Sequence, residues 1–120
     1  WERDIVQPAA GQHFESPVAA ILHAGSYSRR RLVGPAQGGF CEHATPNAFD
    51  VRGFTLADGR IILVLRDWRG DGPAARFLHD ARDGACRLFA TVLSPDYNAA
   101  HADHLHLDQA RRRGGWRMCR

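Results

Sequence analysis

Two strand-like segments separated by a short turn constrain the fold of this chain more than any other feature. The segments are AFDVRGFTL (48–56) and RIILVLRDW (60–68), and Ala57, Asp58 and Gly59 separate them. An Asp-Gly pair between two such runs is a strong signal for a tight hairpin, because glycine readily adopts the positive φ angles that hairpin turns require. The sequence therefore predicts an antiparallel pair of strands in the middle of the chain.

A helix is predicted after this hairpin. Pro73 stands where proline favours the first helical turn, and Gly84 is expected to end the helix. The apolar residues between them recur at the spacing of one helical face: Ala74, Phe77, Leu78 and Ala81. The pattern predicts an amphipathic helix packed on the sheet.

The segments before the hairpin have weaker signals. Residues 3–14 have helical character, and we expect a helix there with Pro8 near a turn boundary. VAAILHAGSY (18–27) predicts a buried strand or a short helix that ends at Gly25. The basic, glycine-rich stretch 28–39 is expected to form a loop.

After the helix, the sequence predicts a strand in CRLFATVL (86–93), a turn in SPDYN (94–98) and a second strand in HLHLD (104–108). This order of elements predicts an α+β fold, with an antiparallel sheet flanked by helices. A length of 120 residues fits one domain, so we treat residues 1–120 as a single unit.

Charge narrows the possible partners without selecting one. The net charge is +3, and all 16 Lys/Arg positions are arginine. The arginine clusters at 29–31 and 111–113 lie in neither a helix-turn-helix nor a zinc-finger pattern, so nucleic-acid binding ranks well behind other functions. A mild positive charge would equally suit an anionic polymer such as a cell wall.

The apolar content and the N-terminus give two expectations about membrane insertion and targeting. No apolar run approaches the roughly 20 residues that cross a bilayer, so we expect no membrane-spanning segment. The chain begins at Trp1 with no charged-then-apolar leader. We therefore expect an N-terminally trimmed or processed piece, with any targeting signal upstream.

Three cysteines leave the redox chemistry open. Cys41, Cys86 and Cys119 form no C-x-x-C pair, so a zinc knuckle is not expected. An odd number leaves either one disulfide and one spare thiol, or a partner missing from this chain.

The stretch HADHLHLD (101–108) raises the question of a metal site. Alternate residues of a strand share a face, so His104 and His106 are expected to project together, with Leu105 and Leu107 buried on the other side. Two such imidazoles can bind zinc, but they can equally be exposed polar residues. H-x-H alone is a weak signal.

A second stretch, CEHATPNAFDV (41–51), strengthens the metal interpretation. His43 stands seven positions before Asp50. A hydrolytic zinc site needs three ligands of the His/Asp/Glu kind and an open position for water, whose pKa the metal lowers to about 7. His43, Asp50 and one histidine of the H-x-H would supply that set, and His104 beside His106 is placed to act as the base that takes the proton.

Together, EHATPNAFDV (42–51) and DYNAAHADHLHLD (96–108) resemble the extensin-like C-terminal domain of bacterial proteins. That family is similar to zinc D-alanyl-D-alanine carboxypeptidases and murein endopeptidases of the Hedgehog/DD-peptidase fold, which share the motif S-x-H-x-x-G-x-A-x-D and a later histidine ligand. The positions that match these motifs are His43, Ala48, Asp50, His104 and His106, and His101 extends the second match to H-x-x-H-x-H. GSYS, LRDWRGDGPAARFLHDARDGACRLF and the final CR extend the resemblance over nearly the whole chain.

The resemblance implies a zinc peptidase that acts on peptidoglycan peptides, in the periplasm or secreted. It implies His43, Asp50 and His106 as Zn²⁺ ligands and His104 as base or proton shuttle. Arg30 is the best candidate to hold the substrate carbonyl oxygen, with Arg29 and Arg31 as alternatives and a solvated loop charge as the competing interpretation. We expect a monomer.

The chain departs from the family pattern at three positions, two of which, Pro46 and Cys41, favour a rival function. Pro46 stands where the motif has glycine, Cys41 where it has serine, and Arg29 where the family commonly has cysteine. Proline cannot adopt the positive φ that glycine often serves. The rival is a non-catalytic, metal-containing domain that binds the cell envelope.

Other polar residues have two interpretations each. Asp103 and Asp108 are candidate acceptors for ligand imidazoles, although Asp108 is equally expected as a surface charge at a strand end. Tyr97 lies in a predicted turn from which it would reach a substrate cleft. No ligand role is expected for His13, His23 or His79, and none is assigned to Asp67. Trp68 and Trp116 are expected in the core or a lid.

Overall fold

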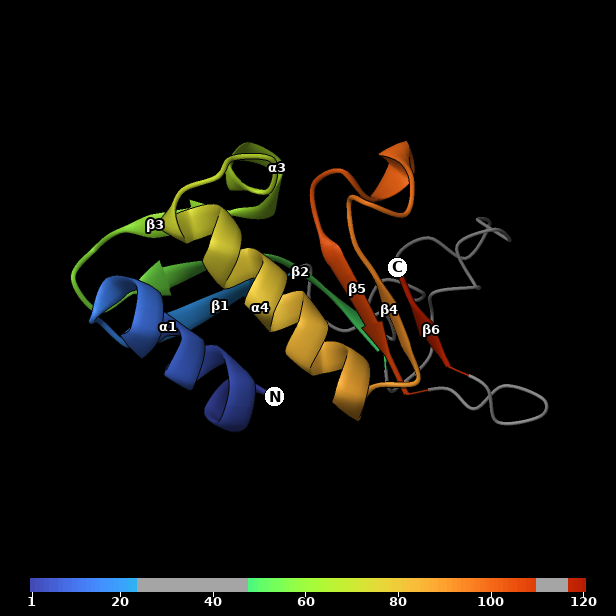
Figure 1. The fold of residues 1–120 in the computed structure, drawn as a ribbon, viewed down its shortest axis with the longest axis horizontal. Coiled ribbons are helices and arrows are strands. Elements are labelled where there is room, and N and C mark those ends of the chain that lie inside the picture. Colours follow the sequence, from blue (N-terminus) through green and yellow to red (C-terminus); the bar gives the residue numbers. More distant parts are fainter. Residues whose placement is uncertain (24–47, 110–116) are drawn as a thin grey trace, which may run out of the picture.

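One mixed sheet with helices on one of its faces forms the described part of this chain (Figure 1). The computed structural model describes residues 1–23, 48–109 and 117–120. Their order is η1 (Glu2–Val6, a π-helix), α1 (Gln7–Phe14), β1 (Val18–His23), β2 (Ala48–Leu56), β3 (Ile61–Leu63), α3 (Val64–Asp67), α4 (Pro73–Leu88), β4 (Thr91–Leu93), η3 (Ala99–His101, a 3₁₀ helix), β5 (Leu105–Asp108) and β6 (Met118–Cys119). The predicted α+β class is confirmed.

The sheet has the strand order β1-β2-β5-β4-β6, with β3 paired to β2. All pairs are antiparallel except that of β4 with β6, which is parallel. The prediction of a purely antiparallel sheet was therefore wrong. Strand β6 is only the two residues Met118 and Cys119, too short for a period-two pattern to reveal it.

The predicted hairpin is confirmed, but its second strand is shorter than expected. β2 and β3 pair antiparallel, and Gly59 in the turn has φ +96°. The chain turns helical at Val64, where the Asp67 carboxylate accepts a hydrogen bond from the Leu63 backbone N–H at 2.9 Å. This bond occupies a backbone donor at the helix start, and buried Trp68 anchors the other end. Trp68 is thus a core residue, as predicted, while Trp116 lies outside the described residues.

Helix α4 begins at Pro73 as predicted but runs past Gly84 to Leu88. Gly84 is needed for close packing and does not end the helix, since a Cβ there would lie 2.3 Å from Cγ2 of Ile5 in η1. The predicted strand over 86–93 accordingly shrinks to β4, because Cys86 to Leu88 form the last turn of α4.

The N-terminal predictions hold in part. The expected helix over 3–14 is present as η1 and α1, with Pro8 in the first turn of α1, where proline is tolerated. β1 is a strand, but the expected burial is wrong beyond Val18, since Ala19 and Ala20 are exposed on this edge strand. The predicted end at Gly25 and the loop over 28–39 lie outside the described residues.

The core lies between the sheet and the helices α1 and α4, which cross in front of the strands in Figure 1. Val51 and Phe54 of β2 and Leu105 and Leu107 of β5 are fully or almost fully buried against Phe77 of α4. Phe54 and Phe77 meet edge to face with ring centroids 5.0 Å apart. Leu105 and Leu107 alternate with His106 along β5, so His106 lies on the other face. In β2, the register shift beside Arg52 lets Val51 and Phe54, three positions apart, both face the core.

Gly53 is a site where an added methyl group should destabilise the sheet. A Cβ at this position would lie 2.3 Å from the Ile62 backbone oxygen in β3, and a paired strand cannot easily move away. We expect Gly53→Ala to lower the free energy of unfolding by about 1–3 kcal/mol, measured by urea denaturation. Gly11→Ala is the control: no atom lies within 4 Å of its added Cβ, and alanine in α1 should gain up to about 1 kcal/mol. An unchanged midpoint for Gly53→Ala would contradict this close approach.

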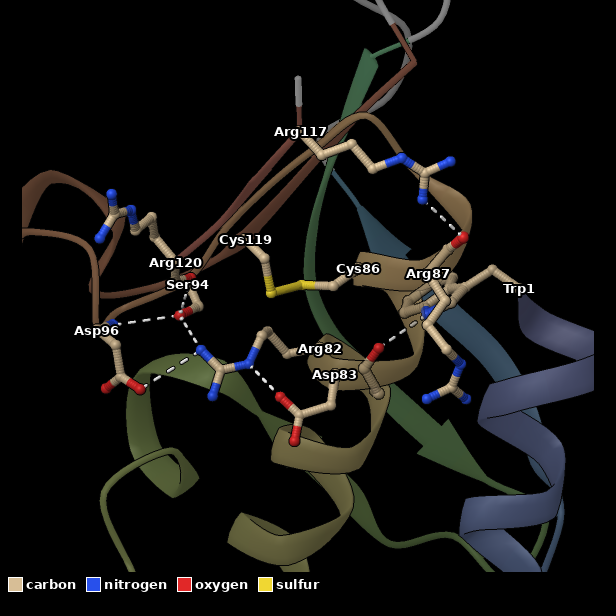
Figure 2. Close-up of a disulfide and its surroundings, with 11 residues drawn as sticks. Trp1, Arg82, Asp83, Cys86, Arg87, Ser94, Asp96, Arg117, Cys119 and Arg120 are labelled. Carbon is tan, nitrogen blue, oxygen red and sulfur yellow. Dashed lines mark hydrogen bonds and ion pairs between the residues drawn. A yellow bond between two sulfur atoms is a disulfide. The ribbon is translucent and has the colours of Figure 1, made fainter. Parts of the chain in front are cut away.

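A disulfide between Cys86 and Cys119 ties β6 to the end of α4 (Figure 2). It closes a loop with a sequence separation of 33 residues. Beside it, buried Ser94 donates a hydrogen bond to the Arg120 backbone oxygen at 2.7 Å and accepts one from Arg82 at 3.0 Å. The disulfide and these bonds hold the last residues of the chain on β4. Cys41 lies outside the described residues.

Opening this disulfide should cost much of the stability of the domain. For a loop of this length, cross-linking is worth about 3–4 kcal/mol through the restricted unfolded chain. We expect that loss, in urea denaturation, for the double variant Cys86→Ser/Cys119→Ser and for the reduced wild type. The double variant should be insensitive to reductant. A wild-type midpoint that reductant does not move would contradict the pairing.

In residues 1–23, 48–109 and 117–120, no helix combines the length and the apolar character that crossing a bilayer requires.

Candidate functional site

Asp50 and His106 face each other across the pair of strands at the centre of the sheet. Asp50 of β2 is the direct cross-strand partner of His106 of β5. His106 Nδ1 lies 2.9 Å from Asp50 Oδ1, and both residues are buried. His106 stands on the face opposite Leu105 and Leu107, which pack in the apolar core, as the strand alternation predicted. Two residues 56 positions apart in the sequence thus form one buried polar pair.

The second imidazole nitrogen of His106 faces another carboxylate. Its Nε2 lies 3.5 Å from Asp108 Oδ2, on the same side of β5. Asp108 is only 8% exposed, so the alternative that it is a surface charge at the strand end was wrong. Carboxylates beside histidine nitrogens are the usual partners that orient a metal-ligating imidazole.

His104 lies next to this pair, just before β5 begins. Its Nδ1 is 2.8 Å from Asp103 Oδ1, and its Nε2 is 3.9 Å from Asp50 Oδ2. Asp50 therefore has one carboxylate oxygen toward His106 and the other toward His104. His104 is largely buried, with a side chain 14% exposed, so the structure brings together both histidines of the H-x-H around one aspartate.

Arg52 is a member of the site that sequence reasoning missed. It follows Asp50 by two positions on β2, and its Nη1 donates to Asp103 Oδ2 at 2.9 Å. The hydrogen bond from His104, and after it the positive charge of Arg52, hold the pKa of the Asp103 carboxyl below its usual value. The signal was available, because residues i and i+2 of a strand share a face.

His101 and Tyr97 form the outer part of the cluster. His101, in η3, is buried, and its Nδ1 lies 2.7 Å from Asn98 Oδ1. Its ring centroid is 4.9 Å from that of His104 and 6.4 Å from that of His106. Tyr97 meets the His101 ring edge to face at 5.4 Å and is 41% exposed. The predicted turn over 94–98 is confirmed and carries Tyr97 at the edge of the cluster.

Asp96 anchors that turn to the helical layer. It accepts a hydrogen bond from Trp68 Nε1 at 3.0 Å and pairs with Arg82 at 3.4 Å. These two contacts, the Trp68 bond first, lower the pKa of the Asp96 carboxyl. His79 stacks on Trp68 with ring centroids 3.9 Å apart, which accounts for it without a ligand role. His13 likewise pairs with Asp80 at 2.6 Å, away from the cluster.

Several predicted site residues cannot be placed. His43, Arg30 and its alternatives Arg29 and Arg31, Cys41 and Pro46 all lie outside the described residues. Among the described ranges, no group of three or more His, Cys, Asp or Glu side chains is arranged to hold a metal ion. The described cluster holds two of the three expected ligands, Asp50 and His106.

The donor chemistry of this pair fits zinc. Imidazole nitrogen and carboxylate oxygen are both ordinary Zn²⁺ ligands, and two donors of one tetrahedral zinc lie about 3.5 Å apart. His106 Nδ1 and Asp50 Oδ1 are in direct hydrogen-bond contact at 2.9 Å, so the two donors already face each other. Asp108 Oδ2 lies 3.5 Å from the remaining nitrogen of His106.

The fold and the cluster define an α+β domain with a buried His/Asp site on one face of its sheet. A family model described as "Extensin-like protein C-terminus" matches residues 1–120. The chain therefore belongs to the extensin-like C-terminal family, as the sequence motifs indicated. Searches of curated proteins and of solved structures found no match.

Proposed function

We propose that this domain is a zinc-dependent peptidase that hydrolyses amide bonds in the stem peptides or cross-links of peptidoglycan. The observation that carries the proposal is the meeting of Asp50, His106 and His104 in one buried cluster, in the order that the sequence motifs require. The similarity of those motifs to the carboxypeptidases and endopeptidases of the Hedgehog/DD-peptidase fold supplies the reaction class.

In this proposal Asp50 and His106 hold the zinc ion together with His43. When bound, zinc of this kind lowers the pKa of a water ligand to about 7 and polarises a carbonyl oxygen. His106 Nδ1, the nitrogen that faces Asp50, would be the ligand atom, and Asp108 would orient the ring from the Nε2 side.

His104 moves the proton in this reaction. Its Nε2 faces Asp50 Oδ2 at 3.9 Å, beyond direct hydrogen-bond distance and within the span of a bridging water. From that position Nε2 takes a proton from the attacking water and returns it to the leaving amine. Arg30 would hold the carbonyl oxygen of the substrate as its negative charge grows.

The proposed location is the bacterial cell envelope, periplasmic or secreted. The Cys86–Cys119 disulfide supports it, because such bonds persist in oxidising compartments. The net charge of +3 also suits an anionic wall polymer.

A non-catalytic, metal-containing domain that binds the cell envelope is the second candidate. It is favoured by Pro46 and Cys41, which replace the glycine and the serine of the enzymes' first motif close to His43. A loop of different shape there would keep a metal pocket for recognition but misplace the substrate.

Metal analysis followed by muropeptide digestion separates these candidates. The peptidase should purify with about one zinc per chain, and a chelator should lower its melting temperature. It should also release shorter peptides from purified muropeptides, which mass spectrometry detects. Zinc content with an unchanged muropeptide profile would favour the binding domain. Absence of zinc, with no effect of chelator on melting, would contradict both.

A further inference from the structure

We propose that Arg52 and Asp103 form a positioning relay that fixes the ring proton of His104 on Nδ1 and so makes Nε2 the proton-accepting atom. The inference rests on the proposed function, since it assigns the atom with which His104 would act. It concerns two residues, Arg52 and Asp103, that would touch neither the metal nor the substrate.

The first step concerns the hydrogen bond between His104 and Asp103. An ionised carboxylate only accepts hydrogen bonds, so the nitrogen 2.8 Å from Asp103 Oδ1 must carry a proton. That nitrogen is Nδ1 of His104. The other tautomer would set the Nδ1 lone pair against the carboxylate oxygen, two acceptors without a proton between them.

The second step concerns what keeps Asp103 an acceptor. Its other oxygen, Oδ2, accepts from Arg52 Nη1 at 2.9 Å. Arginine has donors only and stays charged, so this side of the carboxylate is always occupied by a donor. The two contacts lower the pKa of Asp103, which agrees with an ionised carboxylate.

The third step concerns direction. With its proton on Nδ1, a neutral His104 presents the Nε2 lone pair toward Asp50 across 3.9 Å, a gap that one water donating to both acceptors can bridge, whereas Nδ1 is in direct contact with Asp103. The relay and the ligand side of the cluster share a strand, since Arg52 and Asp50 both project from β2. β2 therefore holds His104 from one side through Arg52 and Asp103 while it supplies Asp50 on the other.

The isosteric change Asp103→Asn gives the relay a sharp test. An asparagine amide has one acceptor oxygen and one donor NH₂ group. Because Arg52 can only donate, the amide oxygen should turn to Arg52 and the NH₂ group to His104. The NH₂ group then needs an acceptor at Nδ1, so the proton of His104 is expected to move to Nε2.

The tautomer can be read without any enzyme activity. Full-length chain with ¹⁵N-labelled histidine, freed of metal by chelation, is measured by long-range ¹H–¹⁵N correlation at about pH 8, above the ordinary histidine pKa of about 6.5. We expect a protonated Nδ1 in the wild type and a protonated Nε2 in Asp103→Asn. In Asp103→Asn/Arg52→Ala the amide is free to turn back, and a return of signal for protonated Nδ1 is expected. Asp4→Asn is the control, because Asp4 and its partner Arg3 are an exposed pair in η1.

The tautomer of His104 in each variant either supports or contradicts the relay. A wild-type His104 protonated on Nε2, or an Asp103→Asn spectrum that keeps Nδ1 protonated, would overturn it. If the double variant Asp103→Asn/Arg52→Ala shows no signal for protonated Nδ1 of His104, Arg52 is not part of the relay. Matching melting temperatures of the variants would exclude unfolding as the cause.

Kinetics then connect the relay to the proposed function. If the zinc-loaded protein cleaves muropeptides, Asp103→Asn should lower kcat about 10²- to 10⁴-fold with KM and zinc content kept, as the same change does beside the histidine of a catalytic triad. An unchanged kcat would show that the tautomer does not matter for cleavage. Wild-type protein with the expected tautomer but no cleavage would contradict the peptidase and leave the relay standing.

Discussion

Replacing His106 with alanine is expected to remove zinc from the purified protein and to abolish muropeptide cleavage. His106 Nδ1 and Asp50 Oδ1 are the two proposed ligand atoms, and they lie 2.9 Å apart. Loss of a residue that only orients a ligand typically weakens metal binding about 10- to 100-fold. Loss of the ligand itself should exceed the upper end of that range. The measurement is zinc content by metal analysis, with affinity from competition against a chelator.

Two matched variants make this prediction specific. Asp108→Asn changes the carboxylate 3.5 Å from His106 Nε2 and should weaken zinc binding by about 10- to 100-fold without abolishing it. His13→Ala changes a histidine paired with Asp80 outside the cluster and should leave zinc binding unchanged. Full zinc content in His106→Ala would contradict the proposed ligand set.

The sequence could predict which faces the site residues occupy, but not their register. Strand alternation placed His104 and His106 opposite Leu105 and Leu107, and the contacts agree, because the leucines pack in the apolar core while His106 and His104 face Asp50. Alternation alone does not pair Asp50 with His106, because sliding β5 by two residues along β2 keeps every side chain on the same face. The motif resemblance joined the two residues before the structure did, since it matched both stretches in the right order.

Element ends were less predictable than element types. Gly84 looked like a helix end, yet the helix continues because η1 passes so close to it that a side chain would meet Ile5. Val64 looked like part of a strand, yet the Asp67 side chain and the burial of Trp68 favour a helical turn there. In both cases contacts between distant segments override the local pattern, and a single sequence does not contain those contacts.

The polar shell of the site was the least predictable part. Arg52 reaches Asp103 only because the turn after η3 brings residue 103 beside β2. The anchoring of Asp96 by Trp68 and Arg82 depends in the same way on helical residues that meet a loop far along the chain. Such hydrogen bonds follow from tertiary structure, so they carry no sequence spacing of their own.

Replacing His104 with alanine is expected to slow cleavage about 10²- to 10⁴-fold while zinc stays bound. His104 is not one of the proposed ligands, and its Nε2 is 3.9 Å from the Asp50 carboxylate, so its loss removes the proton-accepting group and leaves Asp50 and His106 paired. General acid–base groups contribute about 10²- to 10⁴-fold to rate, and kcat should fall by that factor. The measurement is muropeptide cleavage at matched zinc content.

The comparison of His106→Ala with His104→Ala tests whether zinc binding and proton transfer belong to different histidines. His106→Ala should lose zinc and activity together, whereas His104→Ala should lose activity alone. The control for the second variant is His13→Ala, which removes a histidine paired with Asp80 outside the cluster; its kcat should equal that of wild type. Activity of His104→Ala equal to wild type would show that another group takes the proton. Loss of zinc in His104→Ala would make this histidine a ligand. Either His104 would then replace His106 as the ligand, or both histidines of the H-x-H would bind the metal.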